Sequence, residues 1–188
     1  MTDQLKRRTR IAKSSFFIQN FDDKHIGINI IAAVSMIFMV ALKDDLVLVP
    51  PKTRLAVEII AIGLIIIFSE VYHLNFQGFL GLYEIPFIPS VVITIIGMLG
   101  VINAYNLIDG VDGLASIIAL IIFGNFGLIF LTVENYFFFL ICVSFAGMLG
   151  AFLFYNFSKT KKIFMGDTGS LIIGFSAVFL GLYLSKLI

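Results

Sequence analysis

Long apolar runs separated by short polar segments dominate the chain after residue 25. A helix that crosses a bilayer needs roughly 17–25 mostly apolar residues, and about six runs reach that length. We therefore predict an all-α fold, a polytopic membrane helical bundle of about six transmembrane helices. The predicted spans are Ile26–Leu42, Leu55–Tyr72, Ile85–Ile102, Leu114–Leu131, Tyr136–Tyr155 and Thr168–Leu187.

The composition supports a membrane protein. Of the 188 residues, 60% are hydrophobic and only 13% are charged, whereas a soluble domain carries about 25% charged residues. The predicted surrounding is therefore the lipid bilayer. The net charge of +1 predicts no nucleic-acid partner. The single cysteine excludes an internal disulfide, and the two histidines lie too far apart for a zinc motif. We expect a polar basic N-terminal segment, residues 1–25, and one membrane-embedded core, residues 26–188.

The charge of the loops predicts how the bundle is oriented. With six spans, the loops Lys43–Arg54, Asn103–Gly113 and Asn156–Asp167 share one face, and they carry six Lys and Arg residues. The loops His73–Glu84 and Thr132–Asn135 share the other face and carry none. The positive-inside bias makes the first face cytoplasmic. The basic residues before the first span disagree, because this topology places them outside.

The acidic residues of the core lie on the same predicted face. Asp44 and Asp45 end the first span, Asp109 and Asp112 follow the third, and Asp167 opens the sixth. Ionisable groups at membrane depth are costly, so they tend to be paired or functional. A solvated helix end would explain one aspartate, but three clusters on one face favour a functional site.

The segment NAYNLIDGVDGLA, residues 103–115, places a polar side chain at every third position, at Asn103, Asn106, Asp109 and Asp112. On an α-helical or 3₁₀ turn this spacing lines one ridge. Ordinary helix capping would explain one or two of these residues but not the regular set. Carboxylates without His or Cys nearby favour Mg²⁺ or Mn²⁺. Such a site beside loop lysines suits a diphosphate substrate, although lysines there equally fit lipid-headgroup anchors.

The segment KKIFMGDTGS, residues 161–170, allows a second interpretation, because its Asp-Thr-Gly matches the signature of aspartic proteases. The soluble enzyme pairs two copies of this signature in a β-rich fold, and this chain has one copy opening a membrane helix. A membrane aspartyl protease needs two carboxylates within the bilayer that share a proton. A small transporter needs polar groups near the bilayer midplane, where only Asn29, Thr94 and Asn125 are candidates. We rank both behind a metal-diphosphate site.

Three segments resemble the polyprenyl-phosphate N-acetylhexosamine-1-phosphate transferases of glycosyltransferase family 4. They are LKDDLVLVPPKTRL (42–55), NAYNLIDGVDGLA and KKIFMGDTGSL (161–171), in the order of the family. The segment GLYEIP (81–86) resembles the cell-envelope members, such as the undecaprenyl-phosphate GlcNAc-1-phosphate transferase. The resemblance covers nearly everything from Ile26 onward.

The resemblance implies transfer of N-acetylhexosamine-1-phosphate from a UDP-sugar to undecaprenyl phosphate, with release of UMP, to start a cell-envelope polysaccharide. It implies a multi-pass protein of the bacterial inner (plasma) membrane whose active face is cytoplasmic, and it allows a homodimer. Asp44 resembles the residue proposed to deprotonate the lipid phosphate. Asp45 and Asp167 resemble the Mg²⁺ end of the site. The nucleotide-sugar wall would comprise Asn103, Asn106, Asp109, Asp112 and Phe164, the last as a contact for uracil.

The chain also departs from the family. About six spans stand where the family has about ten or eleven, and neither an early loop with a Pro-Arg-Gly-Gly-like segment nor a late histidine-rich loop is found. These departures imply a truncated member, for which an inactive remnant is the alternative to an active enzyme. Glu58 stands where a Gln is usual in the family, and Arg54, four residues earlier, is expected to form an ion pair with it.

Overall fold

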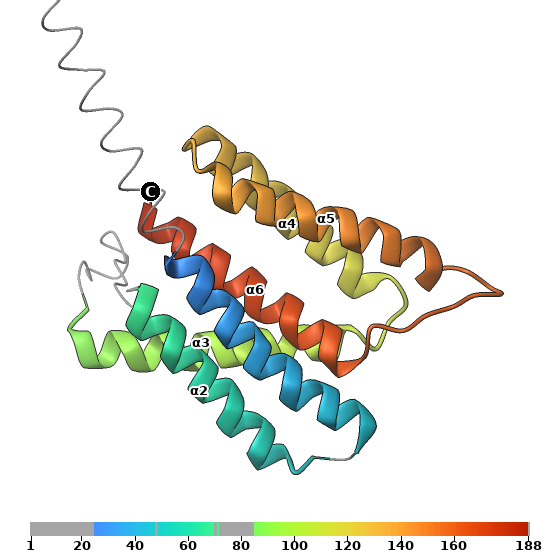
Figure 1. Cartoon of the computed structure of the whole chain (residues 1–188), viewed down its shortest axis with the longest axis horizontal. Helices are drawn as coiled ribbons and strands as arrows, with labels where there is room; N and C mark the ends of the chain where they lie inside the picture. The colour runs from blue at the N-terminus through green and yellow to red at the C-terminus, as the bar shows by residue number, and fades with distance from the viewer. Residues whose placement is uncertain (1–24, 48, 70, 72–84, 188) are drawn as a thin grey trace, which may run out of the picture.

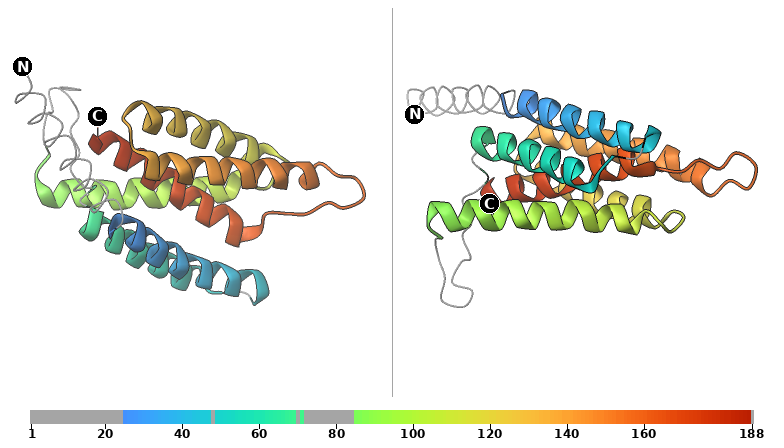
Figure 2. Two further views of the ribbon diagram at one scale, coloured as in Figure 1. Left: turned by 45° about the horizontal axis from the view of Figure 1, so that its top comes forward. Right: turned by 90° about the horizontal axis from the view of Figure 1, so that it is seen from below.

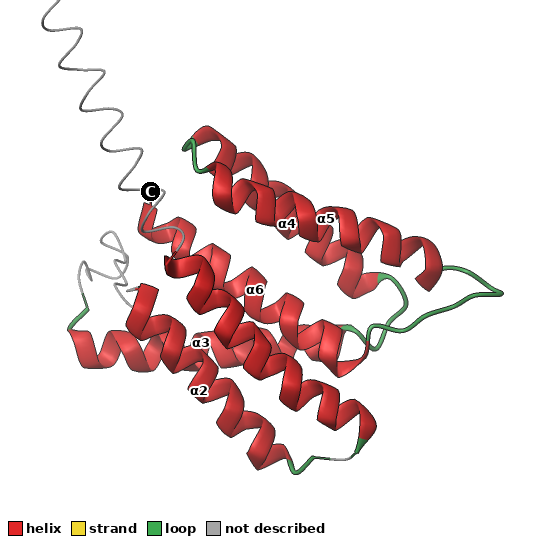
Figure 3. Ribbon diagram, viewed as in Figure 1, coloured by secondary structure: helices red, strands yellow, loops and turns green. Residues whose placement is uncertain are grey.

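The structure is a computed structural model that describes residues 25–47, 49–69, 71 and 85–187. Throughout these ranges the regular structure is α-helical, without a strand (Figure 3). The predicted basic segment up to residue 24 and the loop residues 72–84 lie outside the described residues. The helices are His25–Leu46, α2 (Pro51–Ser69), α3 (Phe87–Ile108), α4 (Leu114–Thr132), α5 (Tyr136–Asn156) and α6 (Gly166–Leu187).

The all-helical membrane bundle is confirmed, with small differences in the spans. Five of the helices in the described ranges, all except α2, are long and apolar enough to cross a membrane. The first helix continues to Leu46 and α3 continues to Ile108, so each extends beyond the predicted apolar run. Polar residues therefore lie within the last turns of these two helices rather than in the loops that follow.

Helix α2 is less apolar at one end, because Lys52, Arg54 and Glu58 fall within its first eight residues. Its 19 residues still reach about 28 Å, close to the roughly 30 Å of a hydrocarbon core. Arg54 contacts Asp167 at the start of α6, and the carbonyl of Ser69 accepts a hydrogen bond from Lys186 at the end of α6. Helix α2 thus runs parallel to α6 over the same depth.

The helices form two groups around α6 (Figures 1 and 2). Helices α4 and α5 pack against each other as a hairpin, and α3 packs mainly against α6. Gly174 permits the close approach of α3 and α6, since a Cβ there would lie 3.1 Å from the Cβ of Tyr105 and 3.3 Å from the Cα of Ile102. In the most apolar 18-residue stretch of α6, 61% of the residues are buried, against 17–33% in the corresponding stretches of the other candidate spans, so α6 is the central helix.

One end of the bundle gathers the loops that the sequence predicted to share a face. Asp45 at the end of the first helix contacts the start of α6, which is also reached by Arg54 from the start of α2 and by Asn106 from the end of α3. Asn156 at the end of α5 contacts Gly113, which precedes α4. This end, called the acidic end below, holds every predicted site residue.

Candidate functional site

Arg54 contacts three carboxylates at the acidic end. Its Nη1 lies 2.8 Å from Asp167 Oδ2 and 3.5 Å from Asp44 Oδ2. Its Nε lies 3.1 Å from Glu58 Oε1, which confirms the ion pair expected from the sequence. The predicted catalytic residues Asp44 and Asp167 therefore converge on one cationic group, although one ends the first helix and the other opens α6.

Asn103 and Asn106, one turn apart on α3, reach toward the same carboxylates. Asn103 Nδ2 donates to Glu58 Oε2 at 2.9 Å, and Asn106 Nδ2 donates to Asp167 Oδ1 at 2.8 Å. Asn106 also donates to Ser170 Oγ at 2.7 Å, one turn further along α6. Both asparagines therefore belong to the group that surrounds Arg54.

Asp45 holds the start of α6. Its Oδ1 accepts from the amide of Asp167 at 3.1 Å, and its Oδ2 accepts from the amide and the hydroxyl of Thr168. The first amides of a helix lack partners within the helix, so a carboxylate that accepts from them acts as a cap. Gly166 has a φ of 69°, and a Cβ there would lie 3.2 Å from Asp45 Oδ2. Glycine thus permits both the backbone conformation and the close approach of Asp45.

Asp109 directly follows α3 and faces the start of α6. Burial, and after it the negative charge of Asp167, raise the pKa of Asp109 to about 6, although a hydrogen bond from the Gly166 amide acts in the opposite direction. Two carboxylates and the positive end of the α6 dipole therefore lie close together. The two carboxylates therefore concentrate negative charge beside the start of α6.

Asp112 and Phe164 lie apart from the Arg54 group. The chain turns after α3, and Asp112 forms an ion pair with Lys162 in the loop that precedes α6. The Nζ of Lys162 lies 5.2 Å from the centre of the Phe164 ring, which is 74% exposed. The regular spacing of the segment therefore ends at Asp109, because residues beyond the helix no longer share its ridge.

Asn156, which the sequence did not single out as a site residue, ties the two loops together. It is buried at the end of α5; its Oδ1 accepts from the Gly113 amide at 2.7 Å, and its Nδ2 donates to the Ile163 carbonyl at 2.8 Å. Gly113 has a φ of 73° and lies against the ring of Phe157. A polar residue at the end of an apolar helix is common, so the sequence held no specific indication of this role.

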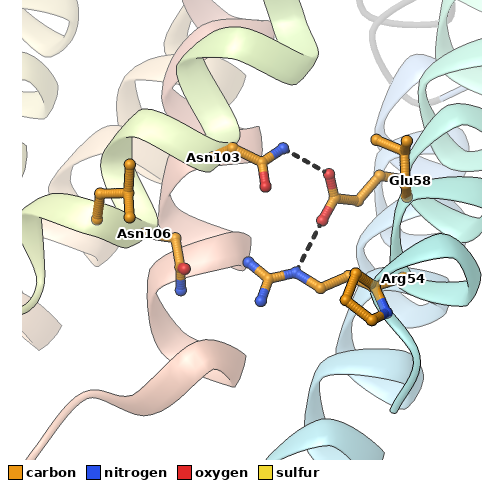
Figure 4. Close-up of a pocket in the computed structure, with 7 residues that line it drawn as sticks. Arg54, Glu58, Asn103 and Asn106 are labelled. Atoms are coloured by element: carbon orange, nitrogen blue, oxygen red, sulfur yellow. Dashed lines mark hydrogen bonds and ion pairs between the residues drawn. The ribbon is translucent and has the colours of Figure 1, made fainter.

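A cavity of about 370 Å³ lies between α2 and α3 at this end. Figure 4 shows Arg54, Glu58, Asn103 and Asn106 around it. Its remaining lining is apolar and comes from Pro51, Leu55 and Leu107. Leu55 is 45% exposed and Leu107 is 81% exposed. The cavity thus has a polar floor and an apolar rim.

The donor set at this end suits a hard divalent cation. The described residues contain no group of three His, Cys, Asp or Glu side chains that could hold a metal. However, Mg²⁺ commonly uses one or two carboxylates and completes its coordination with water and substrate phosphates. Asp44 and Asp167 present two oxygens to one cationic nitrogen, Arg54 Nη1, so a second cation would find the same two oxygens close together. These residues fit Mg²⁺ or Mn²⁺.

Residues 28–185 match glycosyl transferase family 4. The chain belongs to this family. No curated protein matches it. Membership in the family suggests polyprenyl-phosphate sugar-1-phosphate transfer, and the candidate spans are consistent with a reaction at a membrane.

Proposed function

We propose that this protein transfers N-acetylhexosamine-1-phosphate from a UDP-sugar to undecaprenyl phosphate and releases UMP, the first step of a cell-envelope polysaccharide. The observation that carries this proposal is the convergence of Asp44 and Asp167 on Arg54, beside Asn106, in a chain of glycosyl transferase family 4. One guanidinium faces three carboxylates there, so negative charge is in excess. That excess supports a divalent cation, which would in turn attract a diphosphate.

In the proposed reaction, an oxygen of the acceptor phosphate attacks the phosphorus that carries the sugar. A new P–O bond forms, the bond from that phosphorus to the UMP oxygen breaks, and UMP leaves with the negative charge. Asp44 would take any proton that remains on the acceptor phosphate. The acceptor is already an anion, so its activation needs little base strength, and positioning and charge neutralisation should dominate.

We assign the charge neutralisation to Asp167 and Asp44 with a bound Mg²⁺, which would draw charge from the diphosphate oxygens. Arg54 adds a fixed positive charge in the same place. Asp45 contributes through α6, because its hydrogen bonds hold the backbone of Asp167. In this proposal Asn103, Asn106 and Asp109 face the nucleotide sugar. Asp112 and Phe164 contact it from the loops that follow α3 and precede α6.

The cavity between α2 and α3 supports a lipid acceptor. Its polar floor at Arg54 suits a phosphate, and its apolar rim at Leu55 and Leu107 suits the first isoprene units. The acidic end carries Lys43, Lys159 and Lys161 in addition to the paired Lys162. By the positive-inside bias we place this end on the cytoplasmic side of a bacterial plasma membrane, where UDP-sugars are available.

The test is UMP release by membranes that contain the protein, given UDP-N-acetylglucosamine, undecaprenyl phosphate and Mg²⁺. We expect release that depends on all three additions and that is lost in Asp44→Asn. Membranes with the inserted protein that release no UMP, with any UDP-N-acetylhexosamine, would contradict the proposal. Equal release by the protein and by Asp44→Asn would remove Asp44 from the mechanism.

A further inference from the structure

Glu58 is a fully buried carboxylate to which the proposed reaction gives no task. It lies in the second turn of α2, and both of its oxygens are used. Oε1 accepts from Arg54 Nε at 3.1 Å, and Oε2 accepts from Asn103 Nδ2 at 2.9 Å. A buried carboxylate is costly unless it is paired and hydrogen-bonded. Glu58 meets both conditions, and its two partners both line the cavity.

These two contacts orient both partners. With Nε held by Glu58, the guanidinium directs Nη1 toward Asp44 and Asp167. The Nδ2 of Asn103 is held by Glu58 and by the Leu99 carbonyl. Figure 4 shows the amide oxygen of Asn103 pointing into the space between the labelled residues. Glu58 thus determines which atoms of Arg54 and Asn103 face the site.

Arg54 and a divalent cation would compete for the same oxygens. Nη1 contacts Asp44 Oδ2 and Asp167 Oδ2, which are the atoms that fit Mg²⁺ or Mn²⁺. A guanidinium remains charged at any physiological pH. If it had no other partner, leaving these carboxylates would strand a positive charge in a partly buried place. Glu58 gives Arg54 a partner on its own helix.

We propose that Glu58 is a positioning residue of the transferase site. It anchors Arg54 on α2, so that a divalent cation can displace Arg54 from Asp44 and Asp167 and bind there. The assignment rests on the proposed function for its purpose, but the competition that it describes is a property of the metal site alone.

Glutamine, although usual at this position in the family, would not reproduce both contacts that Glu58 makes in this chain. Both neighbours present N–H groups, so the group between them must accept twice. A glutamine offers one oxygen and one NH₂ group, and the NH₂ group would face a donor. Glu58→Gln therefore keeps the size of the side chain while it releases Arg54 or Asn103.

The experiment measures Mn²⁺ binding to the full chain in lipid nanodiscs by electron paramagnetic resonance. The proteins are the unaltered chain, Glu58→Gln, Arg54→Gln and the double variant. We expect Glu58→Gln to weaken Mn²⁺ binding about tenfold, because negative charge is lost and Asp44 and Asp167 become the remaining carboxylate partners of Arg54, which then competes more strongly with the metal. Arg54→Gln should tighten binding, because the competing cation is gone. In the Arg54→Gln background, Glu58→Gln should change binding by only about twofold.

Three results would overturn the assignment. They are the absence of Mn²⁺ binding to the unaltered chain, unchanged binding in Glu58→Gln, and a change in Mn²⁺ affinity on Glu58→Gln that is as large in the Arg54→Gln background as in the unaltered chain. Thr94→Val is the matched control, because Thr94 is a buried polar residue of α3 whose hydroxyl bonds within its own helix; it should leave Mn²⁺ binding unchanged.

Glu58→Asp covers the case in which Glu58→Gln does not fold. It keeps the charge, but its shorter side chain cannot reach both donors, so Mn²⁺ binding should weaken less than tenfold but measurably. Binding equal to that of the unaltered chain would overturn the assignment. UMP release is measured separately on the same samples. If the effect of Glu58→Gln on Mn²⁺ binding depends on Arg54 as expected but no UMP is released, the proposed function alone is contradicted. If UMP is released but the effect does not depend on Arg54, the role of Glu58 alone is contradicted.

Discussion

The two halves of the bundle are held together in different ways. In the α4–α5 hairpin, aromatic rings provide the contacts between helices: Phe123 stacks on Phe145 with ring centres 4.5 Å apart, and Phe130 packs on Phe138 at 5.4 Å. At the acidic end, the first helix, α2, α3 and α6 meet through ion pairs and hydrogen bonds. Arg54 and Asp167, which are 113 residues apart in the chain, are one such pair.

The two kinds of contact have different effects on the helices: one packs them closely, and the other fixes how they are placed along each other. Lipid tails are as apolar as the side chains of the hairpin, so apolar contacts alone favour close packing without fixing the depth of one helix against another. Directional contacts such as those of Asp45 with the start of α6 do fix it. We therefore expect substitutions at the acidic end to change catalysis and metal binding, and substitutions in the hairpin to change stability.

The largest expected effect belongs to Asp167→Asn. Asp167 joins Arg54 on α2 to Asn106 on α3, and the variant removes the charge while it keeps the shape. UMP release that depends on Mg²⁺ should fall at least about 100-fold. Membrane insertion should remain, because the apolar spans are unaltered; resistance of the protein to alkaline extraction from membranes checks this. Unchanged turnover would exclude Asp167 from the site.

A smaller effect is expected at Asp45, where the type of substitution separates two roles. Asp45→Ala removes the cap of α6, which is worth about 1 kcal/mol, and the displaced Asp167 should lower turnover about tenfold. Asn is as good a capping residue as Asp, so Asp45→Asn should retain most of the turnover and the same half-saturating Mg²⁺ concentration.

The opposite result would identify a metal ligand. If Asp45→Asn is as damaging as Asp45→Ala and requires much more Mg²⁺, Asp45 binds the cation, as the family resemblance implies. Titration of UMP release against Mg²⁺ for both variants decides between the cap and the ligand. Neither variant removes a partner of Arg54, so the comparison reports the role of Asp45 alone.

The sequence predicted the spans and the shared face of the aspartates because both depend on local patterns. Apolar runs of sufficient length define helices, and their parity determines which loops meet. The Arg54–Glu58 pair was predictable for the same reason, since residues four apart are neighbours on a helix. The role of Asn156 could not be predicted, because its partners at Gly113 and Ile163 belong to two different loops.

The arrangement around Asp167 also could not be predicted, because it depends on the depth of α6 against the first helix and α2. The spacing of Asn103, Asn106, Asp109 and Asp112 suggested one continuous ridge. The structure ends α3 at Ile108 and directs Asp112 toward Lys162. A periodic pattern thus brought these residues to one end of the bundle but could not show where the helix stops.

The smallest effect on catalysis is expected for Phe123→Ala in the hairpin. Phe123 is buried and stacks on Phe145, so the variant leaves a void between α4 and α5. In a soluble core such a change costs about 3–5 kcal/mol. The cost here should be smaller, because lipid solvates apolar groups in the separated helices as well. Thermal unfolding in nanodiscs should shift to lower temperature, while UMP release per folded molecule and its Mg²⁺ dependence stay the same. A loss of turnover well below the unfolding temperature would show that aromatic packing in the hairpin also positions the site, and would remove the distinction between the two halves.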